Sequence, residues 1–224
     1  MIILLPPSEG KEPGGKRAWG PASGRFGRAL AGAREPVITA LPLTAPTALK
    51  VRGATAAHAQ LVNTSLVGSP VLAGSVRYSG VVYQGLDFAS LAPAQQRVAQ
   101  DSIVIVSGLL GLAGLGDPLP DYRAPMDASL EGLGKLAAYW KPIITPLLHK
   151  AAKRDVVIDL LTQVHRSAVE PADENWLTVD LVHSDVTGGH AAKFAKGQLA
   201  RWLLDHDITE LRRWKFQGWT AKVR

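Results

Sequence analysis

Apolar residues occur along the chain in two patterns that are typical of strands. Continuous apolar runs, which suit strands covered on both faces, lie at residues 2–5, 102–106 and 156–161. Residues 176–183 alternate apolar and polar side chains, which predicts a half-buried strand. Residues 81–83 predict a further short strand that leads into Gly85. These segments indicate a sheet whose middle strands are fully buried.

Other segments show the three-to-four-residue spacing of apolar side chains that is typical of helices. They are residues 46–66, 92–100, 129–153 and 189–206. Pro142 and Pro146 interrupt the third segment, so it predicts either two helices or one kinked helix. Residues 208–224 predict a helix and a turn, with Asp207 or Thr209 as the N-cap.

Residues 8–36 form a long segment that is rich in Gly and Pro and poor in apolar residues. We expect a loop here, and long loops in folded domains are usually functional or disordered. The chain contains no internal repeat and no linker. Its elements therefore predict one compact domain over residues 1–224, of mixed α/β (or α+β) class, with a central mixed sheet.

Composition narrows the class of protein and of site. The 224 residues include no Cys, which excludes a disulfide scaffold, a cysteine nucleophile and a cysteine metal site. The six His form no metal-binding pattern, so we expect no metal and no cofactor. The longest nearly uncharged stretch, residues 102–116, is too short to span a bilayer. We therefore expect a soluble, cytoplasmic, monomeric protein with no membrane partner.

The net charge of +6 permits a polyanionic partner, but the charge is unevenly distributed. Residues 101–140 hold five acidic and two basic residues, whereas the N-terminal half and the last helices hold the basic excess. Arg123 is thus a cation within an acidic stretch, which makes it a candidate for a specific site. Its alternative role is an ion pair with Asp117 or Asp121.

Residues 112–116, Leu-Ala-Gly-Leu-Gly, match the turn of a helix-hairpin-helix element. In such a turn Gly114 and Gly116 would let backbone N–H groups approach a phosphate without reading base sequence. The alternative is a glycine-rich exit from the preceding strand. Tyr122 and Arg123 follow soon after and could supply a stacking ring and a bidentate phosphate donor.

Four segments resemble, in their order and in their sequences, those of the YaaA family of bacterial peroxide-stress proteins. The first is Pro-Pro-Ser-Glu-Gly-Lys at residues 6–11. The family often has Ser-Pro-Ala-Lys-Thr at this place. Either Glu9 or Lys11 could therefore take the position of the family's Lys. The others are Tyr-Gln-Gly-Leu at 83–86, Ser-Gly-Leu-Leu-Gly at 107–111 followed by Asp-Tyr-Arg at 121–123, and the basic helix at 193–201. The resemblance implies a single α/β domain with a helix-hairpin-helix element beside a positively charged cleft, DNA binding, and protection of DNA against hydrogen peroxide.

The first functional hypothesis is a nucleic-acid-binding protein whose partner is DNA or a nucleotide-like ligand. The candidate contact residues come from the four segments and share positive charge, hydroxyl groups or glycine backbone. They are Ser8, Lys11, Tyr83, Ser107, Gly114, Gly116, Tyr122, Arg123, Lys193, Lys196 and Arg201.

Two other hypotheses remain open. An enzyme acting on a nucleobase, nucleoside or nucleotide would need a carboxylate, for which Glu9 and Asp159 are the candidates, with Arg123 as a third catalytic residue. Alternatively, the six Trp could form part of a face for a protein partner.

Overall fold

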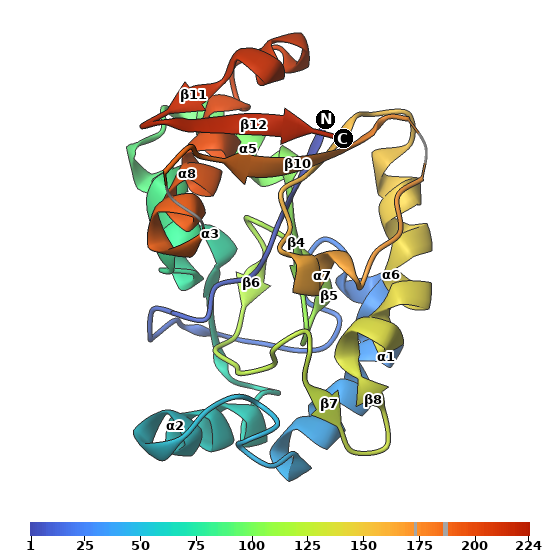
Figure 1. The fold of residues 1–224 in the computed structure, drawn as a ribbon. Helices are drawn as coiled ribbons and strands as arrows, with labels where there is room; N and C mark the ends of the chain where they lie inside the picture. Colours follow the sequence, from blue (N-terminus) through green and yellow to red (C-terminus); the bar gives the residue numbers. More distant parts are fainter. Residues whose placement is uncertain (173, 186–187) are drawn as a thin grey trace.

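Three parallel strands form the middle of a seven-stranded mixed sheet (Figure 1). The computed structural model describes residues 1–172, 174–185 and 188–224. The strand order is β11-β12-β10-β9-β1-β4-β5. In chain order the strands are β1 (Ile2–Leu5), β4 (Ile103–Ser107), β5 (Gly111–Gly114), β9 (Val157–Asp159), β10 (Trp176–Val182), β11 (Lys215–Phe216) and β12 (Trp219–Val223).

The central position of β1 follows from its composition. All four of its residues are buried, as expected for a strand with helices on both faces. Ile3 pairs with Ile103 of β4 on one side and with Ile158 of β9 on the other, both in parallel. β10 extends the parallel part beside β9, whereas β5, β12 and β11 pair antiparallel. The predicted strands at 2–5, 102–106, 156–161 and 176–183 are therefore confirmed, with shifted ends.

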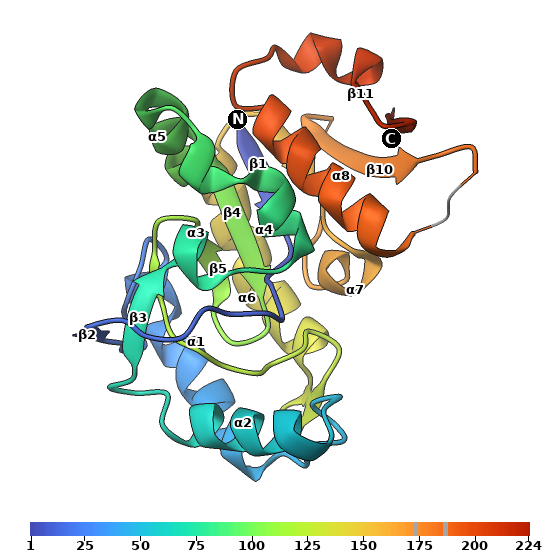
Figure 2. The same cartoon turned by 90° about the vertical axis from the view of Figure 1, so that its left-hand side faces the viewer.

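Helices cover both faces of the sheet (Figures 1 and 2). α1 (Gly27–Ala40) and α6 (Leu136–Ala152) lie on one face; α4 (Val81–Leu86), α5 (Pro93–Ser102) and α8 (Gly189–Trp202) lie on the other. The remaining helical segments are α2 (Gly53–Thr64), α3 (Gly74–Arg77), α7 (Gln163–Arg166) and the 3-10 turns Leu41–Leu43, Phe88–Ser90 and Ile208–Arg213. Two small sheets join β2 (Arg17–Ala18), β3 (Pro70–Ala73) and β6 (Pro118–Leu119), and β7 (Ser129–Leu130) with β8 (Gly134–Lys135).

α4 and α8 lie side by side and approach each other through glycines (Figure 2). A Cβ atom at Gly85 would lie 2.3 Å from the carbonyl oxygen of Phe194, and one at Gly197 would lie 2.0 Å from that of Val82. Such distances are possible only without a side chain. Two glycines of the family-like segments therefore serve backbone contact between these helices.

Two buried arginines hold loops that contain few apolar residues. The Arg34 and Arg77 side chains are each about 1% exposed. Arg34 donates hydrogen bonds to the carbonyl oxygens of Pro21, Ser23, Leu110 and Leu112. Arg77 donates to those of Glu12, Gly14, Pro70 and Leu119. Because a buried guanidinium must have its donors satisfied, these contacts fix the glycine-rich segment that precedes α1.

The structure corrects the helix-hairpin-helix prediction at residues 112–116. Residues 111–114 form β5, which follows β4 after a tight turn at residues 108–110 and pairs with it antiparallel; Gly111, the first residue of β5, has a φ of +66°. The N–H of Gly114 donates to the Asp117 carboxylate at 2.8 Å, so it does not face an external anion. The segment is a strand of the main sheet and the turn after it.

Four other local predictions differ from the structure. The predicted strand at 81–83 is the first part of α4, because burial of Val82, Tyr83 and Leu86 against α8 outweighs the strand preference of two consecutive valines. The predicted loop at 8–36 already contains the start of α1. The helix predicted at 46–66 begins only at Gly53, and 129–153 holds a small hairpin followed by a single helix that contains both prolines.

The 208–224 prediction is confirmed in its first half. Asp207 is the N-cap of the 3-10 turn, since its carboxylate accepts the N–H of Thr209 at 2.8 Å. The rest of the segment, however, forms the β11–β12 hairpin.

Replacement of Gly197 by Ala tests the glycine contact between α4 and α8. We expect a loss of about 1–3 kcal/mol in the free energy of unfolding, because the new methyl group meets a backbone oxygen rather than a movable side chain. Gly32→Ala is the matched control, since Gly32 is a helical glycine whose Cβ would meet nothing within 4 Å. The control should gain about 0.5–1 kcal/mol in chemical denaturation. Equal effects of the two substitutions would contradict the contact.

Candidate functional site

A cavity of about 660 Å³ opens where β1 and β9 end. Its walls come from the loop 6–11 after β1, the segment 162–165 after β9, the segment 122–127, Lys50, the first turn of α4, part of β10 and the first two turns of α8. The chain continues from β1 toward β4 on one side and later reaches β9 on the other. In open α/β sheets, ligands bind outside the carboxyl ends of strands at such a switch point.

Lys11 contributes a largely dehydrated amine to the cavity wall. Its Nζ donates a hydrogen bond to the carbonyl oxygen of Ser8 at 3.0 Å and lies 4.3 Å from the centre of the Tyr122 ring. Burial lowers the pKa of Lys11 to about 8, with Arg123 lowering it further and Asp121 opposing the change. A substantial fraction of this amine is therefore neutral near pH 8.

Ser8 and Tyr83 hold the loop that carries Lys11. The Oγ atom of Ser8 accepts the N–H of Gly80 at 2.8 Å, and the hydroxyl of Tyr83 donates to the carbonyl oxygen of Pro6 at 2.9 Å. Both residues line the cavity. Their polar atoms already have partners within the chain, so they position the loop against α4.

Tyr122 belongs to a buried cluster of hydroxyl groups. Its hydroxyl lies 2.7 Å from the Oγ atom of Ser107 and 2.6 Å from the hydroxyl of Tyr78. Burial raises the pKa of Tyr122 to about 12, so it stays protonated. Since Lys11 lies over the ring, that face of Tyr122 is not open for stacking on a base.

Arg123 pairs with Glu9 across the mouth of the cavity. The Nη1 atom of Arg123 lies 3.1 Å from the Glu9 carboxylate, and its Nε donates to the carbonyl oxygen of Leu49 at 3.2 Å. The Glu9 side chain is 78% exposed. The structure thus brings two predicted catalytic residues together. The alternative partners of Arg123 are engaged elsewhere: Asp117 accepts from Arg25 and Asp121 lies beside His58.

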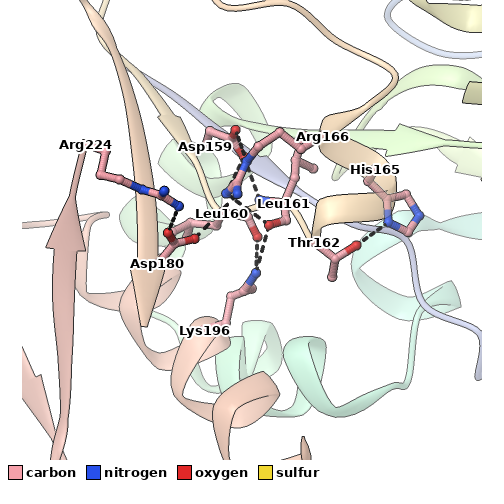
Figure 3. Close-up of polar contacts among 9 residues, drawn as sticks. All are labelled: Asp159, Leu160, Leu161, Thr162, His165, Arg166, Asp180, Lys196 and Arg224. Atoms are coloured by element: carbon pink, nitrogen blue, oxygen red, sulfur yellow. Dashed lines mark hydrogen bonds and ion pairs between the residues drawn. The ribbon is translucent and has the colours of Figure 1, made fainter. Parts of the chain in front are cut away.

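α8 places two lysines in the cavity wall. Lys193 is exposed, whereas the Nζ atom of Lys196 donates to the carbonyl oxygens of Leu160 and Leu161 (Figure 3). Burial lowers the pKa of Lys196 to about 8, and the charge of Arg166 adds to the effect. Lys196 therefore ties α8 to the segment that follows β9.

His165 is a cavity residue that the sequence pattern did not reveal. Its Nδ1 atom lies 2.8 Å from the Thr162 hydroxyl (Figure 3). Burial lowers the pKa of His165 to about 4, which keeps the imidazole neutral at neutral pH. The only hint in the sequence is that His165 follows a predicted buried strand, which by itself does not distinguish a cavity residue from an ordinary surface histidine.

Asp159 does not line the cavity. Its side chain has no exposed surface, and its oxygens accept the N–H of Leu161 at 2.8 Å and the Nε–H of Arg166 at 2.7 Å. Arg166 also approaches Asp180 at 3.5 Å, and Asp180 pairs with Arg224 (Figure 3). The contacts of Asp159 are those of a residue that anchors α7 to β9.

Arg201, Gly114 and Gly116 also lie outside the cavity wall. Arg201 donates to the carbonyl oxygens of Leu86 and Asp87, so it binds the end of α4. Gly114 and Gly116 belong to β5 and the turn after it. The structure therefore collects the predicted binding residues into one cavity only in part.

The tryptophans do not form an exposed face. Five of the six are buried, and Trp202 is partly buried against the core.

Within the described residues, no group of three or more His, Asp and Glu is placed to hold a metal ion. Nor does any described helix combine the length and apolar character needed to cross a membrane.

Comparison with known proteins gives the chain a family. The model described as "Peroxide stress protein YaaA" matches residues 1–223. The chain belongs to the peroxide stress protein YaaA family. A UPF0246 protein of Streptomyces coelicolor is 34% identical over 215 residues, which cover 91% of this chain and 83% of the relative. A UPF0246 protein of Corynebacterium efficiens is 33% identical over 213 residues, covering 91% and 84%.

The family match covers both kinds of residue seen in the structure. The YaaA-like segments supply cavity residues such as Lys11, Arg123 and Lys196, and they also supply the glycines that bring α4 against α8. The role of a residue in a matching segment therefore depends on its contacts.

Replacement of Asp159 by Asn tests whether this residue is structural. We expect a loss of about 3 kcal/mol in the free energy of unfolding, since Arg166 would lose its buried counter-charge. Asp180→Asn is the control; its side chain is 35% exposed, and it should cost less than about 1 kcal/mol. Unfolding in denaturant measures both. If the Asp159→Asn protein keeps its stability but loses turnover of a nucleobase, nucleoside or nucleotide substrate, Asp159 is catalytic instead.

Proposed function

We propose that this member of the YaaA family binds nucleic acid through the cavity at the end of β1, and that this binding protects DNA during peroxide stress. One observation carries the proposal. Lys11, Lys193 and Lys196 all line the cavity, and in the described part of the chain none of them has a carboxylate within ion-pair distance. Dehydrated or unpaired cations around one cavity favour an anionic ligand.

The rest of the wall supports a ligand that is only partly charged. Many of its residues are apolar, among them Pro7, Val82, Met126, Val164 and Leu181. The cavity volume is within the range of small-molecule sites and suits about one nucleotide rather than a duplex. An unpaired nucleotide would place its base against the apolar wall and its phosphates near the lysines.

The proposal predicts a salt-dependent affinity for single-stranded DNA. Three lysine contacts at about 0.7 each give a slope of about −2 in a plot of log affinity against log salt. Lys193→Gln should reduce the magnitude of that slope by about 0.7, the contribution of one contact. Fluorescence anisotropy with a labelled oligonucleotide, from about 50 to about 200 mM salt, measures both.

The matched control is Lys150→Gln, which removes an exposed lysine of α6 that does not line the cavity. It should leave the slope unchanged. Absence of binding at low salt, or an affinity that does not respond to salt, would overturn the proposal.

A second candidate function is an enzyme acting on a nucleobase, nucleoside or nucleotide in the same cavity. It is favoured by Glu9 and His165, an exposed carboxylate and a neutral imidazole in one cavity wall, since such groups can exchange protons with a ligand.

Glu9→Gln tests the enzymatic alternative. If Glu9 acts as an acid or base, turnover of a nucleotide substrate should fall about 100-fold or more while affinity changes little. Product analysis by chromatography, together with anisotropy, separates the two. If no product forms from nucleosides, nucleotides or oligonucleotides with the unmodified protein, the enzymatic alternative is wrong.

A further inference from the structure

Four lysines line the cavity, and Lys50 pairs with Asp127. Among the other three, Lys11 differs from Lys193 and Lys196 in what surrounds its amine. Lys196 donates to two carbonyl oxygens and Lys193 is exposed. Lys11 donates to a single carbonyl oxygen, and its amine lies over the rings of Tyr122 and Tyr78. An amine in apolar surroundings beside another cation is readily neutral, and a neutral lysine is a nucleophile toward carbonyl groups. Burial is the largest influence on the pKa of Lys11; the charges of Arg123 and Arg77 lower that pKa further, whereas those of Asp121 and Glu9 raise it.

The backbone holds Lys11 in a fixed place. Lys11 forms a β-bridge with Tyr78, and the adjacent residues are fixed by hydrogen bonds from Ser79 to Gly10 and from Glu12 to Arg77. Its amine is therefore presented to the cavity from a rigid support, which a reacting group needs for alignment with a bound ligand.

We propose that Lys11 forms an imine with the sugar aldehyde of a nucleotide that has lost its base. This inference rests on the proposed binding of nucleic acid, and it names the reactive class of ligand. A base-less nucleotide keeps the phosphates that the cavity lysines would receive, and its sugar opens to a free aldehyde.

The reaction balances without an oxidant or a reductant. The lone pair of Lys11 Nζ attacks the aldehyde carbon and forms a C–N bond, while the carbonyl oxygen takes up a proton. The nitrogen then passes one of its protons to the resulting hydroxyl group, the C–O bond breaks, and water leaves as the C=N bond forms. The product is a protonated imine, whose positive charge comes from the solvent proton taken up by the oxygen in the first step. Glu9 is the exposed carboxylate in the same wall, and its charge acts on both Lys11 and His165. Glu9 can carry the proton from nitrogen to the leaving oxygen.

Reductive trapping tests the imine. The full chain is incubated with a single-stranded oligonucleotide that carries one base-less site, in the presence of sodium cyanoborohydride, and the adduct is located by peptide mass spectrometry. We expect the adduct on Lys11, and a yield about tenfold or more lower with Lys11→Arg, since a guanidinium does not form the imine. The initial rate should rise as the pH approaches 8, because the neutral amine is the reacting form.

Two controls separate this inference from the proposed function. Lys150→Arg, on the exposed surface of α6, should leave the yield within about twofold, and anisotropy with an oligonucleotide carrying a non-reactive tetrahydrofuran site reports binding alone. Binding without any adduct on Lys11, or an adduct spread evenly over exposed lysines, overturns the imine but not the binding.

A second arm uses 2-deoxyribose 5-phosphate, a free sugar aldehyde. An adduct on Lys11 with this compound but not with the oligonucleotide would keep the reactive amine and replace DNA by a free sugar phosphate as its source. No adduct on Lys11 with either compound would overturn the inference, and peptide mapping of the unmodified protein gives this result even if Lys11→Arg fails to fold.

Discussion

The parallel pairing of β1 between β4 and β9 is the constraint on which the rest of the structure depends. It brings the carboxyl ends of the central strands to one edge of the sheet, so residues far apart in the sequence, such as Lys11 and His165, meet in one cavity. Helices cover both faces of the strands. The edge is thus the part of the sheet that stays open to a ligand.

The loops at that edge contain few apolar residues and are held by polar and backbone contacts instead. Arg34 and Arg77 bind carbonyl oxygens from segments that hydrophobic burial would leave loose. Gly85 and Gly197 let α8 lie close to α4, and Lys196 of α8 donates a hydrogen bond to the carbonyl oxygen of Leu160, just after β9. Burial removes water from Lys11, Lys196 and His165, which is the main cause of their lowered pKa values.

Residue type and motif position predicted part of the candidate site. Lys11, Arg123, Lys193 and Lys196 lie in the cavity wall as the sequence led us to expect, whereas Asp159 and Arg201 anchor helices. The sequence did not separate these groups, because a charged residue next to a strand or on a basic helix has the same local pattern in either role. The difference is the partner that the fold places beside it. His165 gave no signal for the same reason.

The sequence by itself determined the buried strands, the single α/β domain and the family. The strands and the domain depend on local apolar periodicity, and the family depends on short motifs of similar sequence. Only the tertiary structure decided that 81–83 is helical, that 111–114 is a strand, and that three lysines share one cavity without carboxylate partners in the described part of the chain. These outcomes depend on burial and pairing between segments distant in sequence. The intrinsic preference of one residue for helix or strand is less than about 1 kcal/mol. The free energy gained from such long-range contacts can be larger and then decides the structure.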